Sequence, residues 1–247
     1  TAFMNQAISS NLAYRPQFIS NNYREGRKVF SSIENELLSC EEFSISVAFI
    51  TMGGITPLLQ TLRELECRGI PGRILTTDYL MFSDPKALRI FANFKNIELK
   101  MFVTENAKEG FHTKGYIFKK KEIYRMIVGS SNMTLSALTK NREWNTKIVS
   151  TDQGEYAQNL VSEFEQLWNA EESLSFEQFI ESYTKLYTKN KLIKKQRETA
   201  RQEEIPSLEM YRLQPNSMQV GFINNLRTMY EAGEERALLI SATGTGK

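Results

Sequence analysis

Histidine and cysteine are scarce in this chain of 247 residues, which contains one histidine, His112, and two cysteines, Cys40 and Cys67. The cysteines form no Cys-x-x-Cys pair, and a single histidine cannot complete the ligand set of a zinc site. Isolated thiols fit a protein from a reducing compartment. We therefore expect no metal site and a cytoplasmic location.

Long apolar runs are also missing. No stretch reaches the length of about 20 residues that a transmembrane helix needs, and the N-terminus lacks the basic-then-apolar pattern of a secretory signal. The formal net charge is only +2, so the overall charge says little about partners. Hydrophobic residues make up 41% of the chain, which is enough for a buried core, so we expect a globular protein that does not enter a membrane.

What is present is a set of polar residues whose types suit one phosphate-handling site. His112 and Lys114 are two positions apart, so on a strand both side chains would point to one face. A Gly-Ser-Ser-Asn sequence contributes Ser130 and Asn132, and turns of this kind form anion-binding concavities. Glu143 could hold a histidine in one tautomer. An isolated His-x-Lys carries almost no information, so the prediction depends on all five residues together.

In order and approximate spacing, this set resembles the phospholipase D-type phosphodiesterase signature over roughly residues 30–170. The spacing is most similar to that of the superfamily's metal-independent nucleases and restriction endonucleases. The longer form of the signature has an Asp five residues after the Lys, where this chain has Lys119. Some nuclease members also lack that Asp and use the later Glu, so the departure weakens a lipase interpretation more than a nuclease one.

The resemblance implies hydrolysis of a phosphodiester in two steps. His112 attacks phosphorus to give a phosphohistidine, which water then cleaves, while Lys114, Ser130 and Asn132 stabilise the charged oxygens. No cofactor is implied at this site. Members with one copy of the motif are homodimers with one composite site, where a second histidine protonates the leaving group. The single histidine of this chain therefore implies a homodimer.

Apolar periodicity and turn signals predict an α/β fold with a mixed or parallel sheet. Residues 1–25 are polar, and we expect an arm with little regular structure. The predicted strands cover residues 43–50, 73–77, 97–103, 113–118, 123–128 and 144–150. The predicted helices cover residues 26–39, 56–67, 84–93, 132–138 and 153–169. The N-terminus of the helix at 132–138 would point its dipole at a bound phosphate.

The composition changes after residue 170. Residues 171–187 are acidic and aromatic, and residues 185–202 are dense in lysine and arginine. We interpret this region as a solvated helical linker rather than a dedicated DNA contact. Further along, an apolar run leads into Ala-Thr-Gly-Thr-Gly-Lys, which resembles the P-loop of superfamily 2 helicases, preceded by their adenine-contacting glutamine. The candidate nucleotide-binding residues are Gln219, Thr243, Gly244, Thr245, Gly246 and Lys247.

We therefore predict a phospholipase D-like nuclease domain (1–170), a charged helical linker (171–206) and the truncated start of a RecA-like helicase lobe (207–247). ATP and Mg²⁺ are expected only for a complete helicase, and the chain is expected to be the N-terminal part of a larger restriction-type protein. The expected substrate is nucleic acid, DNA rather than RNA. The alternative is a catalytically weak module of the same fold that binds DNA and targets or regulates the helicase.

Overall fold

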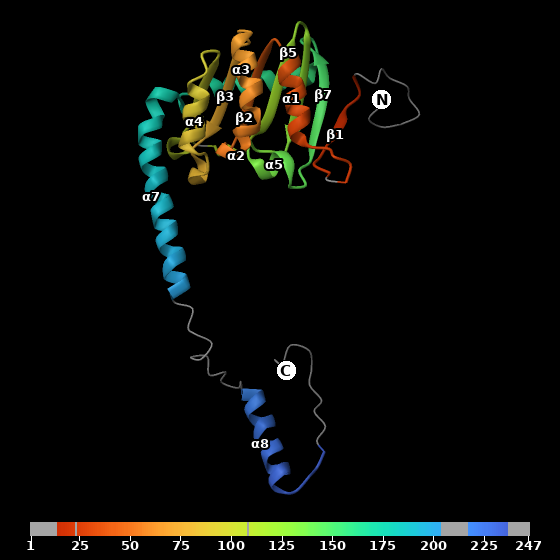
Figure 1. Cartoon of the computed structure of the whole chain (residues 1–247), viewed down its shortest axis with the longest axis vertical. Helices are drawn as coiled ribbons and strands as arrows, with labels where there is room; N and C mark the ends of the chain where they lie inside the picture. The colour runs from red at the N-terminus through yellow and green to blue at the C-terminus, as the bar shows by residue number, and fades with distance from the viewer. Residues whose placement is uncertain (1–13, 23, 108, 204–216, 237–247) are drawn as a thin grey trace. The chain divides into compact units, whose positions relative to one another are not determined.

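The computed structural model describes residues 14–22, 24–107, 109–203 and 217–236, and it contains an eight-stranded sheet (Figure 1). The strands are β1 (Gln17–Ile19), β2 (Glu42–Val47), β3 (Gly72–Thr77), β4 (Ile97–Phe102), β5 (Lys114–Lys120), β6 (Ile123–Gly129), β7 (Asn145–Thr151) and β8 (Ser173–Ser175). The helices are α1 (Val29–Ser39), α2 (Met52–Ile55), α3 (Leu59–Cys67), α4 (Pro85–Ala92), α5 (Leu135–Thr139), α6 (Glu155–Trp168), α7 (Phe176–Glu203) and α8 (Ser217–Glu231). Short 3₁₀ helices η2 (Thr56–Leu58), η3 (Tyr79–Met81) and η4 (Thr104–Asn106) lie between them. Within these described ranges, no helix has the length and apolar character needed to cross a bilayer.

The strand order is β1-β7-β6-β5-β2-β3-β4-β8, and parallel pairing changes to antiparallel pairing in the middle of the sheet. Strands β2, β3 and β4 run parallel, and the segments that connect them contain α3 and α4. Strand β5 pairs antiparallel with β2, and the antiparallel pairing continues through β6 and β7. The predicted α/β fold with a mixed sheet flanked by helices is therefore confirmed.

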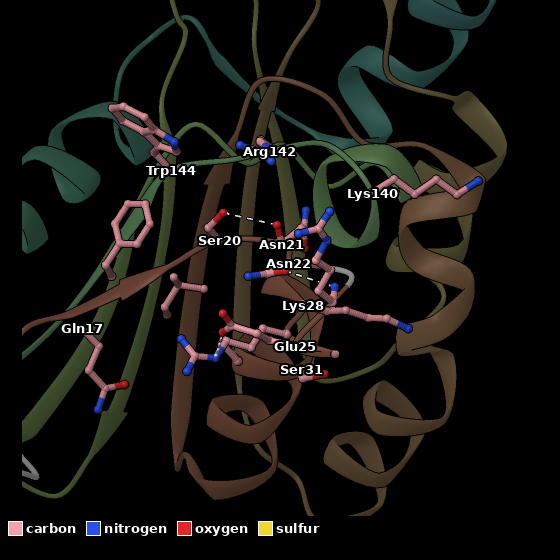
Figure 2. A pocket seen from close by; sticks show the side chains of 16 residues that line it. Gln17, Ser20, Asn21, Asn22, Glu25, Lys28, Ser31, Lys140, Arg142 and Trp144 are labelled. Atoms are coloured by element: carbon pink, nitrogen blue, oxygen red, sulfur yellow. Dashed lines mark hydrogen bonds and ion pairs between the residues drawn. The ribbon is translucent and has the colours of Figure 1, made fainter.

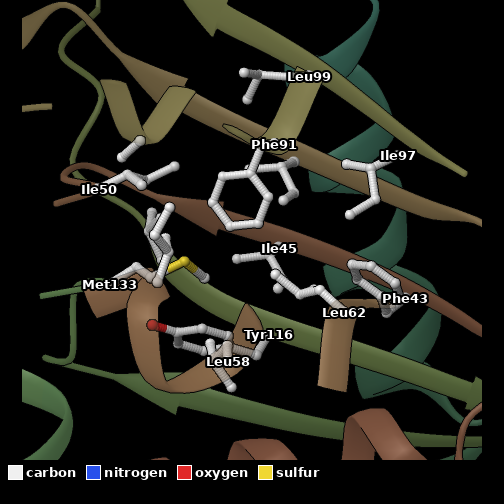
Figure 3. Close-up of a cluster of buried hydrophobic side chains, with 14 of the residues drawn as sticks. Phe43, Ile45, Ile50, Leu58, Leu62, Phe91, Ile97, Leu99, Tyr116 and Met133 are labelled. Atoms are coloured by element: carbon white, nitrogen blue, oxygen red, sulfur yellow. The ribbon is translucent and has the colours of Figure 1, made fainter. Parts of the chain in front are cut away.

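Alternate side chains of the central strands enter different hydrophobic cores on the two faces of the sheet. In β5, Tyr116 belongs to the larger core and the next residue, Ile117, belongs to the smaller core. The larger core, drawn in part in Figure 3, also contains side chains from α1, α3, α4 and α7. The smaller core contains α6 through Phe164 and Trp168. This period of two is what a strand buried on both faces produces.

Part of the N-terminal segment is structured, which corrects the predicted irregular arm; residues 1–13 of that arm lie outside the described residues. Strand β1 pairs antiparallel with β7. Asn21 then donates from Nδ2 to the carbonyl oxygens of Ala137 (2.8 Å) and Asn141 (2.6 Å). Its Oδ1 accepts from the N–H of Val29 at 2.9 Å, where α1 begins. These contacts are polar and long-range, so hydrophobic periodicity gives no sign of them.

The first compact unit extends to residue 193, beyond the predicted domain end at 170. Strand β8 pairs with β4, and Phe179, Ile180 and Tyr183 of α7 are buried in the larger core. The O–H of Tyr183 donates to the carbonyl oxygen of Ser83 at 2.7 Å. The second unit contains α8, and the strand and P-loop predicted within residues 237–247 lie outside the described residues.

The loop after β6 lies against the chain that follows β2. The N–H of Met133 donates to the carbonyl oxygen of Phe49 (3.0 Å), and the N–H of Thr51 donates to the carbonyl oxygen of Met133 (3.0 Å). Gly54 of α2 has no space for a side chain here, because a Cβ would lie 2.0 Å from the carbonyl oxygen of Met133. The close approach of these two segments therefore requires glycine.

We expect Gly54→Ala to lower the free energy of unfolding by about 1–3 kcal/mol, because the obstructing oxygen belongs to the backbone and cannot rotate away. Chemical denaturation would measure the change. Gly110→Ala is the matched control, since a Cβ there would meet nothing within 4 Å. Equal unfolding midpoints for the two variants would contradict the close contact.

Candidate active site

The five predicted site residues lie in segments that meet at one edge of the sheet. His112 lies just before β5 and Lys114 is its first residue, whereas Ser130 and Asn132 follow β6 and Glu143 precedes β7. Because β6 is antiparallel to both β5 and β7, its end lies beside the starts of both neighbours. Strand pairing therefore brings together residues that are far apart in the sequence.

His112 is not on a strand, which corrects the predicted alternation that would have aligned it with Lys114. The histidine is exposed, and β5 begins two residues after it. The lysine side chain makes the contact instead: Nζ lies 2.8 Å from His112 Nδ1 and 3.1 Å from Nε2, and it donates to the histidine carbonyl oxygen at 2.9 Å. The ammonium therefore lies against both ring nitrogens, and the tautomer decides which of them accepts its hydrogen bond.

Aromatic rings border His112, a feature that the motif did not reveal. The imidazole meets the rings of Phe49 and Tyr79 in edge-on arrangements, with centroid distances of 6.2 and 6.4 Å. Phe82 packs edge-on against Phe49 at 5.0 Å and is half exposed. The sequence signal for this rim is the run Tyr-Leu-Met-Phe at 79–82, which is apolar although it lies in a connection between two aspartates.

Glu143 accepts a hydrogen bond from Ser130 rather than from a histidine of the same chain. Ser130 Oγ donates to the Glu143 carboxylate and accepts from the N–H of Trp144 at 3.0 Å. The backbone N–H of Ser130 also donates to the carbonyl oxygen of Trp144 at 3.1 Å. These bonds join the end of β6 to the start of β7. A contact between Glu143 and a histidine stays a prediction for a dimer.

Asn132 lies in an irregular turn and not at the predicted helix start, because α5 begins only at Leu135 and has 5 residues. Thr134 caps that helix by accepting from the N–H of Ala137 at 3.2 Å. Asn132 Oδ1 accepts from the N–H of Phe49 at 3.1 Å. In the part of the chain that the structure describes, no group accepts from Asn132 Nδ2, which leaves this amide able to donate to a phosphoryl oxygen.

Two buried side chains hold the turn that follows β6. Tyr116 donates from its O–H to the carbonyl oxygen of Ser131 at 3.0 Å, and Asn145 Nδ2 donates to Ser131 Oγ at 2.9 Å. Gly129 lets the strands approach, since a Cβ there would lie 2.2 Å from the carbonyl oxygen of Trp144. Buried groups that lose such partners have no water to replace them. Tyr116 and Asn145 therefore hold this turn in place, and no motif in the sequence indicated them.

Lys114 and Glu143 are coupled electrostatically. Burial lowers the pKa of Lys114 from its ordinary value of 10.5, and the negative charge of Glu143 offsets part of this effect by favouring the ammonium. Burial also raises the pKa of Tyr116, and the charge of Glu143 raises it further. The carboxylate therefore acts on the His-Lys side of the site as well as on Ser130.

Other candidate chemistry lies elsewhere or outside the described residues. Among the described residues, no group of three or more His, Cys, Asp and Glu side chains is placed to hold a metal ion. Cys40 is buried, and burial raises the pKa of its thiol to about 11, as in an unreactive structural cysteine. Gln219 lies in α8, whereas the other predicted nucleotide-binding residues, 243–247, lie outside the described residues.

Comparison with known proteins identifies a PLD-like domain in the part of the chain that contains the candidate site residues. A family model described as "Cardiolipin synthase, PLD-like domain" matches residues 34–168. Among curated proteins, no sequence matches the chain. NucT from Helicobacter pylori has a similar structure, with a TM-score of 0.51 and 20% identity over 66% of this chain and 99% of that one. The phospholipase D family member Nuc from Salmonella typhimurium also has a TM-score of 0.51, with 18% identity and the same coverage. At these identities the likeness shows a common fold.

We expect Glu143→Gln to lower the pKa of Lys114 further, because the change removes the charge that favours the ammonium and leaves the burial in place. The pKa can be followed by NMR titration of the methylated lysine. Glu122→Gln, at the exposed tip of the β5–β6 hairpin, controls for the loss of one negative charge. An unchanged or raised pKa of Lys114 in Glu143→Gln would show that the two side chains are not coupled.

Proposed function

Because the chain belongs to the family of the cardiolipin synthase PLD-like domain, we propose that it is a phosphodiesterase that cuts nucleic acid without a metal ion. The observation that carries this proposal is the contact between His112 and Lys114 at the sheet edge. A nucleophile beside a fixed cation and uncharged donors is what phosphodiester cleavage by covalent catalysis requires. The fold shared with Nuc and NucT supports the proposal.

In the proposed first step, a nitrogen of His112 bonds to phosphorus as the bond between phosphorus and the leaving oxygen breaks. Water then bonds to phosphorus and passes a proton to the acid that had protonated the leaving oxygen, while the phosphorus–nitrogen bond breaks and its electron pair returns to the imidazole. Lys114 and Asn132 Nδ2 stabilise the charge on the phosphoryl oxygens. Ser130 has one hydroxyl hydrogen, which is directed at Glu143, so its role in this arrangement is to position that carboxylate.

The leaving oxygen needs a proton from the side of phosphorus opposite the attacking histidine. His112 is the only histidine of the chain and cannot occupy both sides. A two-fold axis through the site would supply a second copy, and two-fold dimers are the commonest homo-oligomers. The proposal therefore includes a homodimer with a composite site, in which the second His112 acts as the acid and Glu143 supports a histidine of the partner chain.

The proposal also places this nuclease in a protein with an ATP-dependent helicase. Its support is the sequence alone, namely the Gly-Lys motif at 243–247 and the upstream glutamine Gln219. ATP and Mg²⁺ would serve that second activity and not the nuclease site. The DNA substrate rather than RNA, and a role in restriction, follow from the same domain order by analogy.

We expect the purified protein to cut oligonucleotides in the presence of EDTA, because Lys114 and amide donors supply the charge stabilisation. His112→Ala should reduce cleavage to background while the thermal unfolding midpoint changes little, since this side chain is exposed. A gel-based assay of labelled DNA and RNA measures cleavage in EDTA and its loss in His112→Ala, and a thermal melt measures the unfolding midpoint. Activity lost in EDTA and restored by Mg²⁺ would reject the phosphohistidine mechanism. A protein that binds DNA without cutting it would instead be the non-catalytic module.

We expect a dimer by light scattering and dominant inhibition on subunit exchange. If both copies of His112 are needed, a mixed dimer of wild-type and His112→Ala chains is inactive. Activity per total chain should then fall as the square of the wild-type fraction. Exchange with Arg89→Ala, an exposed position on α4, is the control and should cause no loss. A linear fall in activity with His112→Ala would show that each chain works alone.

A further inference from the structure

A groove of about 1350 Å³ lies beside the active-site turn, between the N-terminal segment and the chain that leads into β7 (Figure 2). Its walls come from residues 17–22, 24–28 and 31–32 and from the loop that contains Lys140, Arg142 and Trp144. The predicted catalytic residues do not line it, and the proposed mechanism does not use it. The groove is therefore a separate surface that needs its own explanation.

The lining of this groove is strongly cationic. Its charged side chains are Arg24, Arg27, Lys28, Lys140 and Arg142, with Glu25 as the single carboxylate. Glu25 is paired with Arg27 at 3.1 Å. In the described ranges, the other cations form no ion pair, and all of them are exposed. Uncompensated exposed cations on two facing walls attract a chain of negative charges such as a phosphate backbone.

Two aromatic side chains stand in the same groove. Phe18 and Trp144 have exposed fractions of 66% and 73%, and their rings meet edge-on with centroids 6.2 Å apart. Exposed apolar side chains that lie together and are rimmed by polar residues can mark a binding site. Cations that follow a backbone, with aromatic rings on which bases stack, are the combination found in sites for single-stranded nucleic acid.

The groove is built as a fixed surface. Asn21 is 7% exposed, and its bonds join the N-terminal segment to the start of α1 and to both ends of the segment 137–141. The hairpin that carries Arg24 is closed by two backbone bonds between Asn22 and Arg27, at 2.9 and 3.1 Å. These contacts hold the cationic walls at a set separation, which lowers the entropic cost of binding an extended ligand.

The groove and the active-site turn share one residue, Trp144. Trp144 follows Glu143, and its N–H donates to Ser130 Oγ at 3.0 Å while its carbonyl oxygen accepts from the N–H of Ser130 at 3.1 Å. The indole therefore lies in the groove while the backbone of the same residue holds the turn.

We propose that this groove binds single-stranded nucleic acid, with phosphates on the cations and unpaired bases stacked on Trp144 and Phe18. The inference rests on the proposed function, because it assigns the route by which a nucleic acid strand reaches His112. A duplex is a poorer ligand, since its bases already stack on one another and present no free face to the rings. The groove therefore selects unpaired strands ahead of cleavage.

The test measures affinity by fluorescence anisotropy with labelled DNA of about 15 nucleotides, single-stranded or duplex, and with RNA of the same sequence. All proteins carry His112→Ala, so that no strand is cut. We expect Trp144→Ala to weaken single-strand binding about tenfold and duplex binding far less. Trp144→Phe should restore most of the loss, because a phenyl ring still stacks.

A matched pair of double variants separates the groove from general charge. Lys140→Ala/Arg142→Ala should weaken binding and reduce its salt dependence, whereas Lys86→Ala/Arg89→Ala on α4 should do neither. Helix α4 contacts β4, at the opposite end of the strand order from β1 and β7. Equal losses from both double variants, or equal affinity of all Trp144 variants for single strands, would overturn the proposal. If the groove variants lose binding but the wild type cuts no nucleic acid, the groove proposal stands and the nuclease proposal is rejected. If the wild type cuts nucleic acid and the groove variants bind single strands as tightly as the unmodified groove does, the nuclease proposal stands and the groove proposal is rejected.

Discussion

The antiparallel pairing of β5 with β2 is the constraint on which the rest of the site depends. Strand β2 runs parallel to β3, and ligand sites of open α/β sheets lie at the carboxyl ends of such strands. Because β5 runs in the opposite direction, its first residue, Lys114, lies opposite Val47, the last residue of β2. The start of an antiparallel strand thus places His112 and Lys114 at the edge where the parallel strands end.

The next two strands extend this arrangement. Gly115 pairs with Val128, and Gly129 pairs with Asn145, so the end of β6 lies between the starts of β5 and β7. The turn after β6 is held by buried hydrogen bonds from Tyr116 and Asn145, and such bonds are costly to break in a dry interior. A turn held in this way keeps its hydrogen-bond donors in fixed positions, which is what the proposed phosphate site requires.

The small net charge of the chain conceals an uneven distribution. On the sheet, cations are neutralised: Arg73 makes two bonds to Glu165, at 2.6 and 3.0 Å, and Lys147 pairs with the buried Glu36. Beside the active site, the exposed cations of the groove have one carboxylate among them. Composition counts both groups equally, so a cationic surface suited to nucleic acid was invisible in the sequence.

The sequence by itself determined the six central strands, β2 to β7, because apolar periodicity and turn residues act locally, but it did not indicate the short outer strands β1 and β8. It also supplied the candidate site residues, whose types and order indicate the proposed chemistry. The tertiary structure alone decided what these residues contact. Asn132 binds the backbone of Phe49, Glu143 binds Ser130, and aromatic rings border His112.

Asn21 shows why the remainder could not be predicted. Its sequence context is polar and carries no periodic signal. Its side chain nevertheless bonds to Ala137 and Asn141, which lie 116 and 120 positions further along the chain. These bonds join the two segments that form the walls of the groove. Such contacts depend on distances that arise only when the whole sheet has formed, and no local pattern of residue types encodes them.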